Sequence, residues 1–212
     1  MKSILSALLC SLILQSACSQ AREKPRYTNV GARCEGCEAI YDGMPSPDKM
    51  NNTDTLPDFL LNGPKMLVFG TIYQRDGKTP AANTILYIYH TNQDGLYTPS
   101  PDQKGAARRN GALRGWIKTD ASGSYKFYTL KPAPYPNASI PAHIHPIVKE
   151  PDMNEYFVDE YLFSDDPFVK AENKNHDGDI GGNGVVTLTK NGDLLMCKRD
   201  IILGKNVKNY PK

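Results

Sequence analysis

The chain has 212 residues, a length that suits one domain with appendages. Its residues are 40% hydrophobic and 23% charged, a balance that supports a buried core and argues against global disorder. A formal charge of +2 excludes the strong basic field of a nucleic-acid-binding protein. The 17 Gly and 16 Pro favour a turn-rich β protein over a helical bundle. The four His argue against a Cys/His zinc protein and leave room for a metal with oxygen ligands.

The first residues have the pattern of a targeting segment, and we expect residues 1–17 to be a signal peptide. A short positive start precedes the apolar run Ser3–Leu14, which is too short to cross a bilayer. Small residues before Cys18 resemble a bacterial lipoprotein signal, in which this cysteine carries the lipid. Ordinary cleavage after Ala17 or Ala21 is the alternative. Both predict an exported protein, which is either a periplasmic or outer-membrane lipoprotein, attached only by its N-terminal lipid, or a secreted protein.

Residues 18–62 contain clusters of Pro, Asn, Asp and Gly without periodicity, which predicts a tether and an irregular arm. Export permits disulfides, and three cysteines lie outside the signal region, namely Cys34, Cys37 and Cys197. A zinc site at the Cys34–Cys37 pair would need further ligands nearby. We therefore expect a structural bridge within this pair or from it to Cys197, and the spacing leaves the pairing open.

Residues 63–212 are predicted to form one all-β domain. Its β-rich runs are Met66–Tyr73, Thr84–His90, Leu113–Thr119, Ser124–Leu130, Ala142–Val148, Tyr156–Phe163, Val185–Thr189 and Leu194–Ile202. Arg75–Lys78 has the composition of a hairpin turn. Alternation in the fourth run places Tyr125, Phe127 and Thr129 on one face. Short strands at regular spacing indicate an antiparallel β-sandwich of the prealbumin or immunoglobulin-like type.

Two histidines are spaced for metal binding, since residues i and i+2 of a strand face the same side. His143 and His145 follow each other in this way within Pro141-Ala142-His143-Ile144-His145. Just upstream, Tyr135 stands between two prolines in a stiff turn, and Tyr97 ends a loop that follows an earlier strand. The other histidines are expected to be structural: His90 at a strand end, and His176 in a polar surface loop, residues 173–184.

An ordered set of motifs from Phe69 to Pro167 resembles the intradiol ring-cleavage dioxygenases, the family of catechol and protocatechuate dioxygenases. The set comprises the Gly-x-Ile strand with its Asp-Gly turn at 70–77, Tyr89-His90-Thr91-Asn92 with Gly95 and Tyr97, Leu113-Arg114-Gly115, Thr119-Asp120 with Gly123, Tyr125 and Phe127, Tyr135-Pro136, the Pro-Ala-His-Ile-His run, and Tyr161 to Pro167. Each motif is common by itself, whereas the order is specific.

The resemblance implies a mononuclear non-haem Fe(III) site whose ligands are Tyr97, Tyr135, His143 and His145. It implies that Tyr135 is also catalytic, leaving the metal and taking a proton when a catechol binds. The substrates implied are a small aromatic diol and O2, and the product is a cis,cis-muconate. A bound cation favours the phenolate form of tyrosine, which agrees with this ligand set.

Three positions depart from the family pattern and are expected to line the substrate pocket. Ile140 stands where an arginine is usual, Glu160 where a glutamine is usual, and Asn137 where an aromatic residue is usual. Losing a cation and gaining a carboxylate both disfavour an anionic substrate. A replacement cation could come from one of three arginines, Arg108, Arg109 or Arg114.

Two alternatives remain beside the dioxygenase hypothesis. The motifs in residues 66–130 also mark non-catalytic prealbumin-like modules that bind or scaffold in exported proteins. Such a module leaves Tyr135 and the His143-x-His145 pair unexplained. The other alternative is a degenerate family member that binds iron or a catechol without cleaving it. A homo-oligomer is compatible with the sequence, and no nucleic-acid partner is expected.

Overall fold

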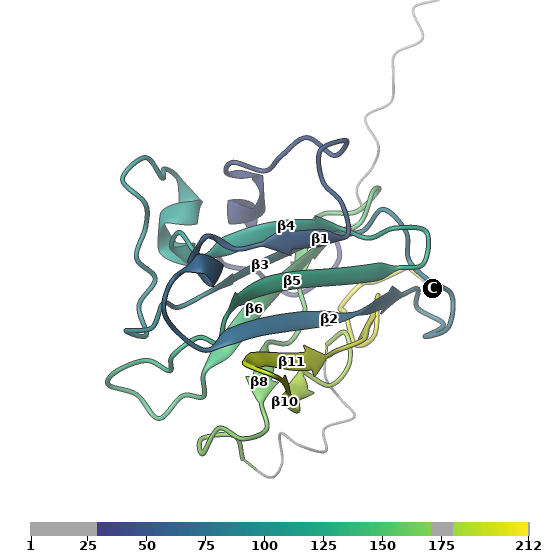
Figure 1. Cartoon of the computed structure of the whole chain (residues 1–212). Coiled ribbons are helices and arrows are strands. Elements are labelled where there is room, and N and C mark those ends of the chain that lie inside the picture. Colours follow the sequence, from purple (N-terminus) through teal and green to yellow (C-terminus); the bar gives the residue numbers. More distant parts are fainter. Residues whose placement is uncertain (1–28, 171–179, 212) are drawn as a thin grey trace, which may run out of the picture.

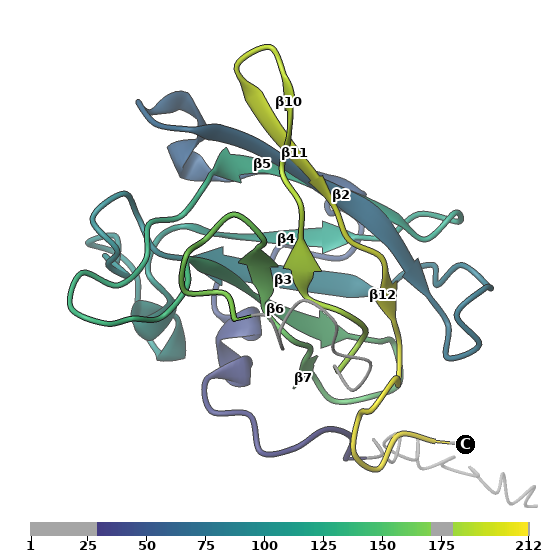
Figure 2. The same ribbon diagram turned by 90° about the horizontal axis from the view of Figure 1, so that it is seen from below.

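The computed structural model describes residues 29–170 and 180–211, which fold into two sheets packed face to face (Figures 1 and 2). The first sheet has the order β1 (Thr53–Thr55), β5 (Ser124–Leu130), β2 (Lys65–Tyr73), β11 (Leu194–Lys198) and β10 (Thr189–Asn191), and β12 (Ile201–Ile202) also pairs with β2. The second has the order β4 (Arg114–Lys118), β3 (Ile85–His90), β6 (His143–Lys149), β8 (Tyr161–Phe163) and β9 (Val185–Val186), and β7 (Tyr156–Phe157) pairs with β6. Three short 3-10 helices complete the elements: η1 (Cys37–Tyr41), η2 (Pro57–Leu60) and η3 (Ala106–Asn110).

The predicted β-sandwich is confirmed, and its strands differ from the predicted runs in two ways. The last three runs are each divided, because the chain turns away from its neighbour between β7 and β8, between β9 and β10, and between β11 and β12. Four pairings are parallel: β1 with β5, β11 and β12 with β2, and β8 with β9. Parallel pairs need long connections, and in each case distant segments of the chain meet.

The main core lies between the sheets and follows from alternation along the strands. In β2 every second side chain is buried, and in β5 the predicted face of Tyr125, Phe127 and Thr129 is the buried one. From the second sheet, Leu86, Ile88 and other aliphatic side chains complete this core. Because alternate residues face opposite sides, the remaining side chains of β3 and β6 point to the outer face of the second sheet.

The N-terminal arm covers part of that outer face. Cys37, Ile40 and Met50 pack in a second cluster with Ile85, Tyr87 and Ile147 of β3 and β6. Figure 2 shows η1 beneath this sheet, on the side away from the first sheet. The arm is irregular, as predicted, yet it packs as part of the domain. It also supplies β1 to the first sheet, so the packed structure extends before residue 63.

The cysteine pairing that the sequence left open is a bridge between Cys34 and Cys37, and Cys197 is a buried free thiol. The indole Nε1–H of Trp116 donates to the Ile40 carbonyl at 2.8 Å and ties the bridged arm to β4. The signal segment, Cys18, His176 and most of the 173–184 loop lie outside the described residues. Within residues 29–170 and 180–211, no helix is long and apolar enough to span a membrane.

Candidate metal centre

Two loops at one end of the sandwich bring Tyr97 and Tyr135 together. Tyr97 lies in the loop after β3, and Tyr135 in the loop between β5 and β6 (Figure 1). Gly95 has φ +75°, and a Cβ there would lie 2.2 Å from the Pro134 carbonyl oxygen. Only glycine combines this left-handed conformation with so close an approach of the two loops. The Thr91 hydroxyl also donates to the Ala133 carbonyl at 2.7 Å, which joins the loops at their base.

The two histidines lie on the outer face of β6, as their spacing predicts. Ile144, between them, is buried in the core between the sheets. The ring of His143 donates its Nδ1–H to the Pro141 carbonyl oxygen at 2.7 Å. This bond fixes the tautomer, so that Nε2 of His143 carries a lone pair and faces the site. His143 is 8% exposed, so this lone pair lies in a largely dry environment.

All four predicted metal ligands lie close together. The Tyr97 and Tyr135 hydroxyl oxygens are 3.0 Å apart. Nε2 of His145 lies 2.8 Å from the Tyr97 oxygen, and Nε2 of His143 lies 3.2 Å from the Tyr135 oxygen. Two oxygens and two nitrogens from three segments of the chain thus contact one another in the order His145, Tyr97, Tyr135, His143.

The electrostatics of these groups fit a bound cation. Burial and the hydrogen bond with Tyr135 raise the pKa of Tyr97 well above its usual value, so its phenol is neutral when no cation is present. Burial and the neighbouring His145 ring lower the pKa of His143, so its imidazole stays neutral and able to ligate. A cation at the centre would favour the phenolate form of the tyrosines, because it offers their oxygens a positive charge in place of the hydrogen bond between them. Two phenolate oxygens and two imidazole nitrogens suit Fe(III).

Tyrosine oxygens are a necessary part of this donor set. Among residues 29–170 and 180–211, no group of three or more His, Cys, Asp or Glu side chains is arranged to hold a metal ion. A site made of those four residue types alone is therefore absent from the part of the chain that the structure describes.

Two side chains, Glu160 and Tyr89, contact the ring of His145. Glu160 Oε1 lies 3.4 Å from Nδ1 of His145. The hydrogen bond with His145 lowers the pKa of Glu160 to about 2, against the opposing effect of burial. The ring of Tyr89 stacks on His145, with centroids 4.6 Å apart and planes 18° apart. His143 is thus oriented by a neutral carbonyl and His145 by a carboxylate, a type of contact that fixes and strengthens ligating histidines.

Two pockets open beside the four ligands. The larger, which we call the tyrosine pocket, has a volume of about 520 Å³ and is lined by Tyr135, Ser139, Ile140, Pro141, His143, Glu160, Leu162, Phe168 and Lys170. The smaller, which we call the arm pocket, has a volume of about 280 Å³ and is lined by Arg33, Cys34, Glu35, Tyr89, His145, Pro146, Ile147, Phe157, Val158 and Glu160. Glu160 lines both pockets, so its carboxylate stands between them.

The structure brings some of the predicted pocket residues to the site and leaves others away from it. Ile140 and Glu160 line the tyrosine pocket, whereas Asn137 is exposed on a turn and lines neither pocket. The three arginines considered as replacement cations point elsewhere. Arg108 donates to the Gln103 carbonyl, Arg109 pairs with Glu38, and Arg114 lies over the Trp116 ring.

Sequence reasoning did not assign several residues of the site. Tyr89 is one of them, and the β3–β6 register, in which it pairs with His145, is the signal that could have found it. The arm residues Arg33 to Glu35 reach the site only because the arm folds over the outer face. Leu162, Phe168 and Lys170 were not expected in the pocket, since their positions depend on the path of the chain after β8.

A second polar cluster lies on the inner face of the same sheet. His90 donates its Nδ1–H to the Thr91 carbonyl at 2.8 Å, and its Nε2 lies 2.7 Å from the Thr129 hydroxyl. That hydroxyl lies 3.0 Å from Asp58 Oδ1, and Asp58 also accepts the Leu130 N–H. His90, Thr129 and Asp58 are all at most 2% exposed. The prediction that His90 forms a structural hydrogen bond is confirmed.

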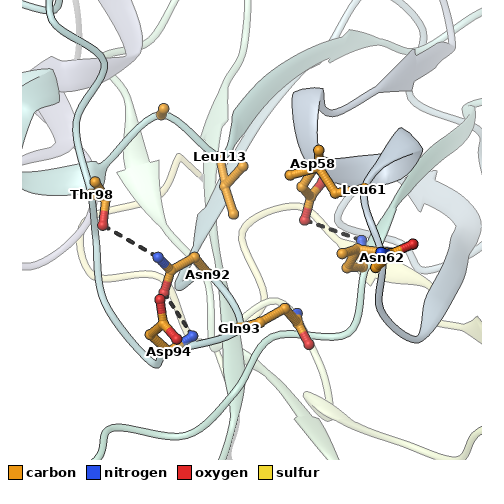
Figure 3. A pocket seen from close by; sticks show the side chains of 10 residues that line it. Asp58, Leu61, Asn62, Asn92, Gln93, Asp94, Thr98 and Leu113 are labelled. Atoms are coloured by element: carbon orange, nitrogen blue, oxygen red, sulfur yellow. Dashed lines mark hydrogen bonds between the residues drawn. The ribbon is translucent and has the colours of Figure 1, made fainter.

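Asp58 also lines a pocket of about 370 Å³ with Leu61, Asn62, Asn92, Gln93, Asp94, Thr98, Ala112, Leu113 and Leu130 (Figure 3). The main polar side chains of this pocket form hydrogen bonds with the loops around it. The Asn92 amide donates to the Thr98 hydroxyl at 3.3 Å, and the Gln93 amide donates to the Lys131 carbonyl at 2.9 Å. This pocket contains none of the four metal-ligand candidates.

A family model described as Dioxygenase matches residues 44–178, which is more than half of the chain and includes both tyrosines and both histidines of the site. The chain belongs to the intradiol ring-cleavage dioxygenase family. Two curated relatives are the protocatechuate 3,4-dioxygenase beta chain of Burkholderia cepacia, 33% identical over 50% of this chain, and catechol 1,2-dioxygenase 1 of Acinetobacter lwoffii, 27% identical over 61% of this chain. The matches cover 48% and 43% of these relatives, so the chain spans about half of their length.

Solved structures show the same fold. Catechol 1,2-dioxygenase from Acinetobacter sp. ADP1 superposes with a TM-score of 0.56 and 22% identity, over 77% of this chain and 61% of that one. The dioxygenase domain of a carbohydrate-binding fusion protein from Streptomyces sp. SirexAA-E superposes with a TM-score of 0.51 and 19% identity, over 76% of this chain and 96% of that domain. The second comparison shows that the sandwich also occurs as a compact unit.

Proposed function

We propose that the protein cleaves a catechol-type aromatic between its two hydroxyl-bearing carbons, with Fe(III) and O2, to give a cis,cis-muconate-type diacid. The observation that carries this proposal is the convergence of Tyr97, Tyr135, His143 and His145, whose oxygen and Nε2 atoms are linked by three contacts of 2.8–3.2 Å. Family membership supports the same reaction class. The atoms balance, since both oxygen atoms of O2 enter the two carboxyl groups formed when the ring bond breaks.

Bound ferric ion would supply Lewis-acid activation of a chelated catechol toward O2. The chain contributes position and proton control. Tyr135 and His143 line the tyrosine pocket, whereas Tyr97 and His145 do not, and of the two ligands in that wall Tyr135 is the one with a phenolate that can accept a proton. Its phenolate oxygen can take one catechol proton as the diol binds. His143, held by the Pro141 carbonyl, and His145, held by Glu160, keep their Nε2 atoms directed at the centre.

We also propose that the protein works outside the cytoplasm, as a lipoprotein anchored through Cys18 or as a secreted protein. The signal-like N-terminus supports this placement. The Cys34–Cys37 disulfide supports it as well, because such bridges persist in oxidising compartments.

A second candidate function is iron binding without ring cleavage. Ile140 and Glu160 favour it, because the tyrosine pocket has lost a cation and gained a carboxylate relative to the family pattern. Both changes disfavour the negative charge that develops on a bound catechol.

Oxygen consumption and muconate formation by the iron-loaded protein test the proposal and separate the two candidates. We expect one O2 consumed for each muconate formed from catechol, and no product with Tyr135→Phe. Protein that binds iron and catechol but forms no muconate would establish the second candidate instead.

A further inference from the structure

The side chains that line the tyrosine pocket indicate which substituent a substrate has, and the four ligands do not. Ile140 is 45% exposed and Phe168 is 40% exposed, and both line this one pocket together with Leu162. Large apolar side chains that gather in a concave, solvent-open place mark a site for an apolar group. Since Tyr135 and His143 line the same pocket, that apolar group would belong to the molecule that meets the ligands.

The charged residues of the pocket wall favour no charged substituent. Glu160, which contacts His145, lines the pocket, and so does Lys170. An acidic or a basic substituent would therefore have one like and one opposite charge in the wall, so these two residues offer neither of them a net attraction, and either would lose hydration on entering. An uncharged substituent meets no like charge and loses little hydration on entering.

The size of the pocket leaves room for such a substituent. An apolar cavity of roughly 150 Å³ is large enough to hold a benzene ring. The tyrosine pocket has a volume of about 520 Å³, well above the need of a bare catechol ring. Ile140, Leu162 and Phe168 form the apolar part of the wall around this volume, beside the polar side chains of Ser139, Glu160 and Lys170.

We propose that the substrate class is a catechol with an uncharged apolar substituent, such as an alkyl group, which packs against Ile140, Leu162 and Phe168. This inference rests on the proposed function, because it takes the tyrosine pocket as the catechol site. Ile140 is then a specificity-determining residue, and so is Phe168. Filling an apolar pocket with extra methylene groups commonly changes affinity by about tenfold or more.

Calorimetric titration of iron-loaded protein under nitrogen tests the inference without relying on turnover. The probes are catechol, 4-tert-butylcatechol, 3,4-dihydroxybenzoate and 3,4-dihydroxyphenethylamine. We expect the alkyl catechol to bind about tenfold more tightly than catechol, and both charged catechols to bind more weakly than catechol. Equal affinities, or tighter binding of either charged probe, would overturn the inference.

Variants of the lining residues test which of them causes the preference for the alkyl catechol. Ile140→Arg should reverse the order of the alkyl and carboxylate probes, and Phe168→Ala should reduce the alkyl preference. Leu60→Ala, at an 88% exposed position outside this pocket, is the matched control and should keep the wild-type order. If Ile140→Arg fails to fold, Ile140→Lys provides the same charge test, and an unchanged order in both Ile140→Lys and Phe168→Ala would contradict the assignment.

Different results contradict the proposed ring cleavage and the proposed substrate class. Protein that prefers the alkyl catechol under nitrogen but yields no muconate in air contradicts only the proposed cleavage. Protein that forms muconate while binding all four probes equally contradicts only the substrate class. If the chain takes up no iron, titrating the iron-free protein with the same probes still measures the preference of the pocket wall.

Discussion

Neighbouring residues of β3 serve two polar clusters on opposite faces of one sheet. Tyr89 faces outward and stacks on His145, whereas His90 faces inward and bonds to Thr129. The inner cluster is enclosed between the sheets and draws its partners from backbone groups as well as side chains. The outer cluster opens to two pockets, and its heteroatoms face one another.

This contrast separates a structural polar network from a candidate metal centre within one fold. A buried network that includes backbone partners satisfies groups that would otherwise destabilise the core. Four lone-pair donors aimed at a common point, with an open pocket beside them, gain more from a cation than from their mutual hydrogen bonds. Substitutions in the inner cluster should therefore reduce the free energy of unfolding, and substitutions in the outer cluster should reduce iron binding.

The largest effect is expected from removing a metal ligand. Tyr97→Phe and His145→Ala should each abolish the visible phenolate-to-iron charge-transfer band, because a donor to the metal is lost. The melting temperature of the iron-free protein should change by less than about 4 °C, since neither side chain belongs to the core between the sheets. Visible absorption after iron loading and thermal melts measure both effects. An unchanged band in both variants would refute the ligand assignment.

The next largest effect is expected from the inner cluster. Asp58→Ala leaves the buried Leu130 N–H without its acceptor and removes the Asp58 contact of the buried Thr129 hydroxyl, at a cost of about 3 kcal/mol of unfolding free energy. For a chain of this size the melting temperature should fall by roughly 6–12 °C. The iron band per folded protein should stay the same. Loss of the band with no loss of stability would reverse the roles assigned to the two clusters.

A smaller effect is expected from the arm. The double variant Cys34→Ser/Cys37→Ser removes a bridge between residues three apart, which should reduce the unfolding free energy by about 2 kcal/mol. Melts of the iron-free protein with and without a thiol reductant provide the matched control. The wild type should lose the same stability on reduction, while the double variant should not respond. Iron binding should persist, because none of the four donors comes from the arm.

The smallest effect is expected from Glu160→Gln. The amide keeps a hydrogen-bond acceptor for His145 and removes the negative charge, so iron affinity should fall by roughly tenfold, at the lower end of the effects of such supporting contacts. Competition with a chelator measures this change. Glu38→Gln, which disrupts an exposed ion pair with Arg109, is the matched control and should have no effect. Equal affinities for Glu160→Gln and wild type would show that the carboxylate does not support His145.

Much of the fold could be predicted because it depends on local patterns, and so could the common face of two candidate ligands. The strand period of two predicts that His143 and His145 share a face, and alternation predicts the buried face of β5. Tyr97 and Tyr135 required the family resemblance, because loops bring them together and loop paths have no simple periodicity. The Glu160–His145 contact depends on the register of β6 with β8, and the packing of the arm depends on distant contacts made by Ile40 and Met50. Neither is encoded in a local pattern.

The most direct test of the proposed metal centre is titration of the metal-free protein with Fe(III), followed by visible absorbance. We expect a burgundy phenolate-to-iron band that grows to a limit at one iron per chain. We also expect Tyr135→Phe to shift or abolish this band. A chain that stays colourless after iron loading, or an identical band in Tyr135→Phe, would contradict the proposed centre of Tyr97, Tyr135, His143 and His145.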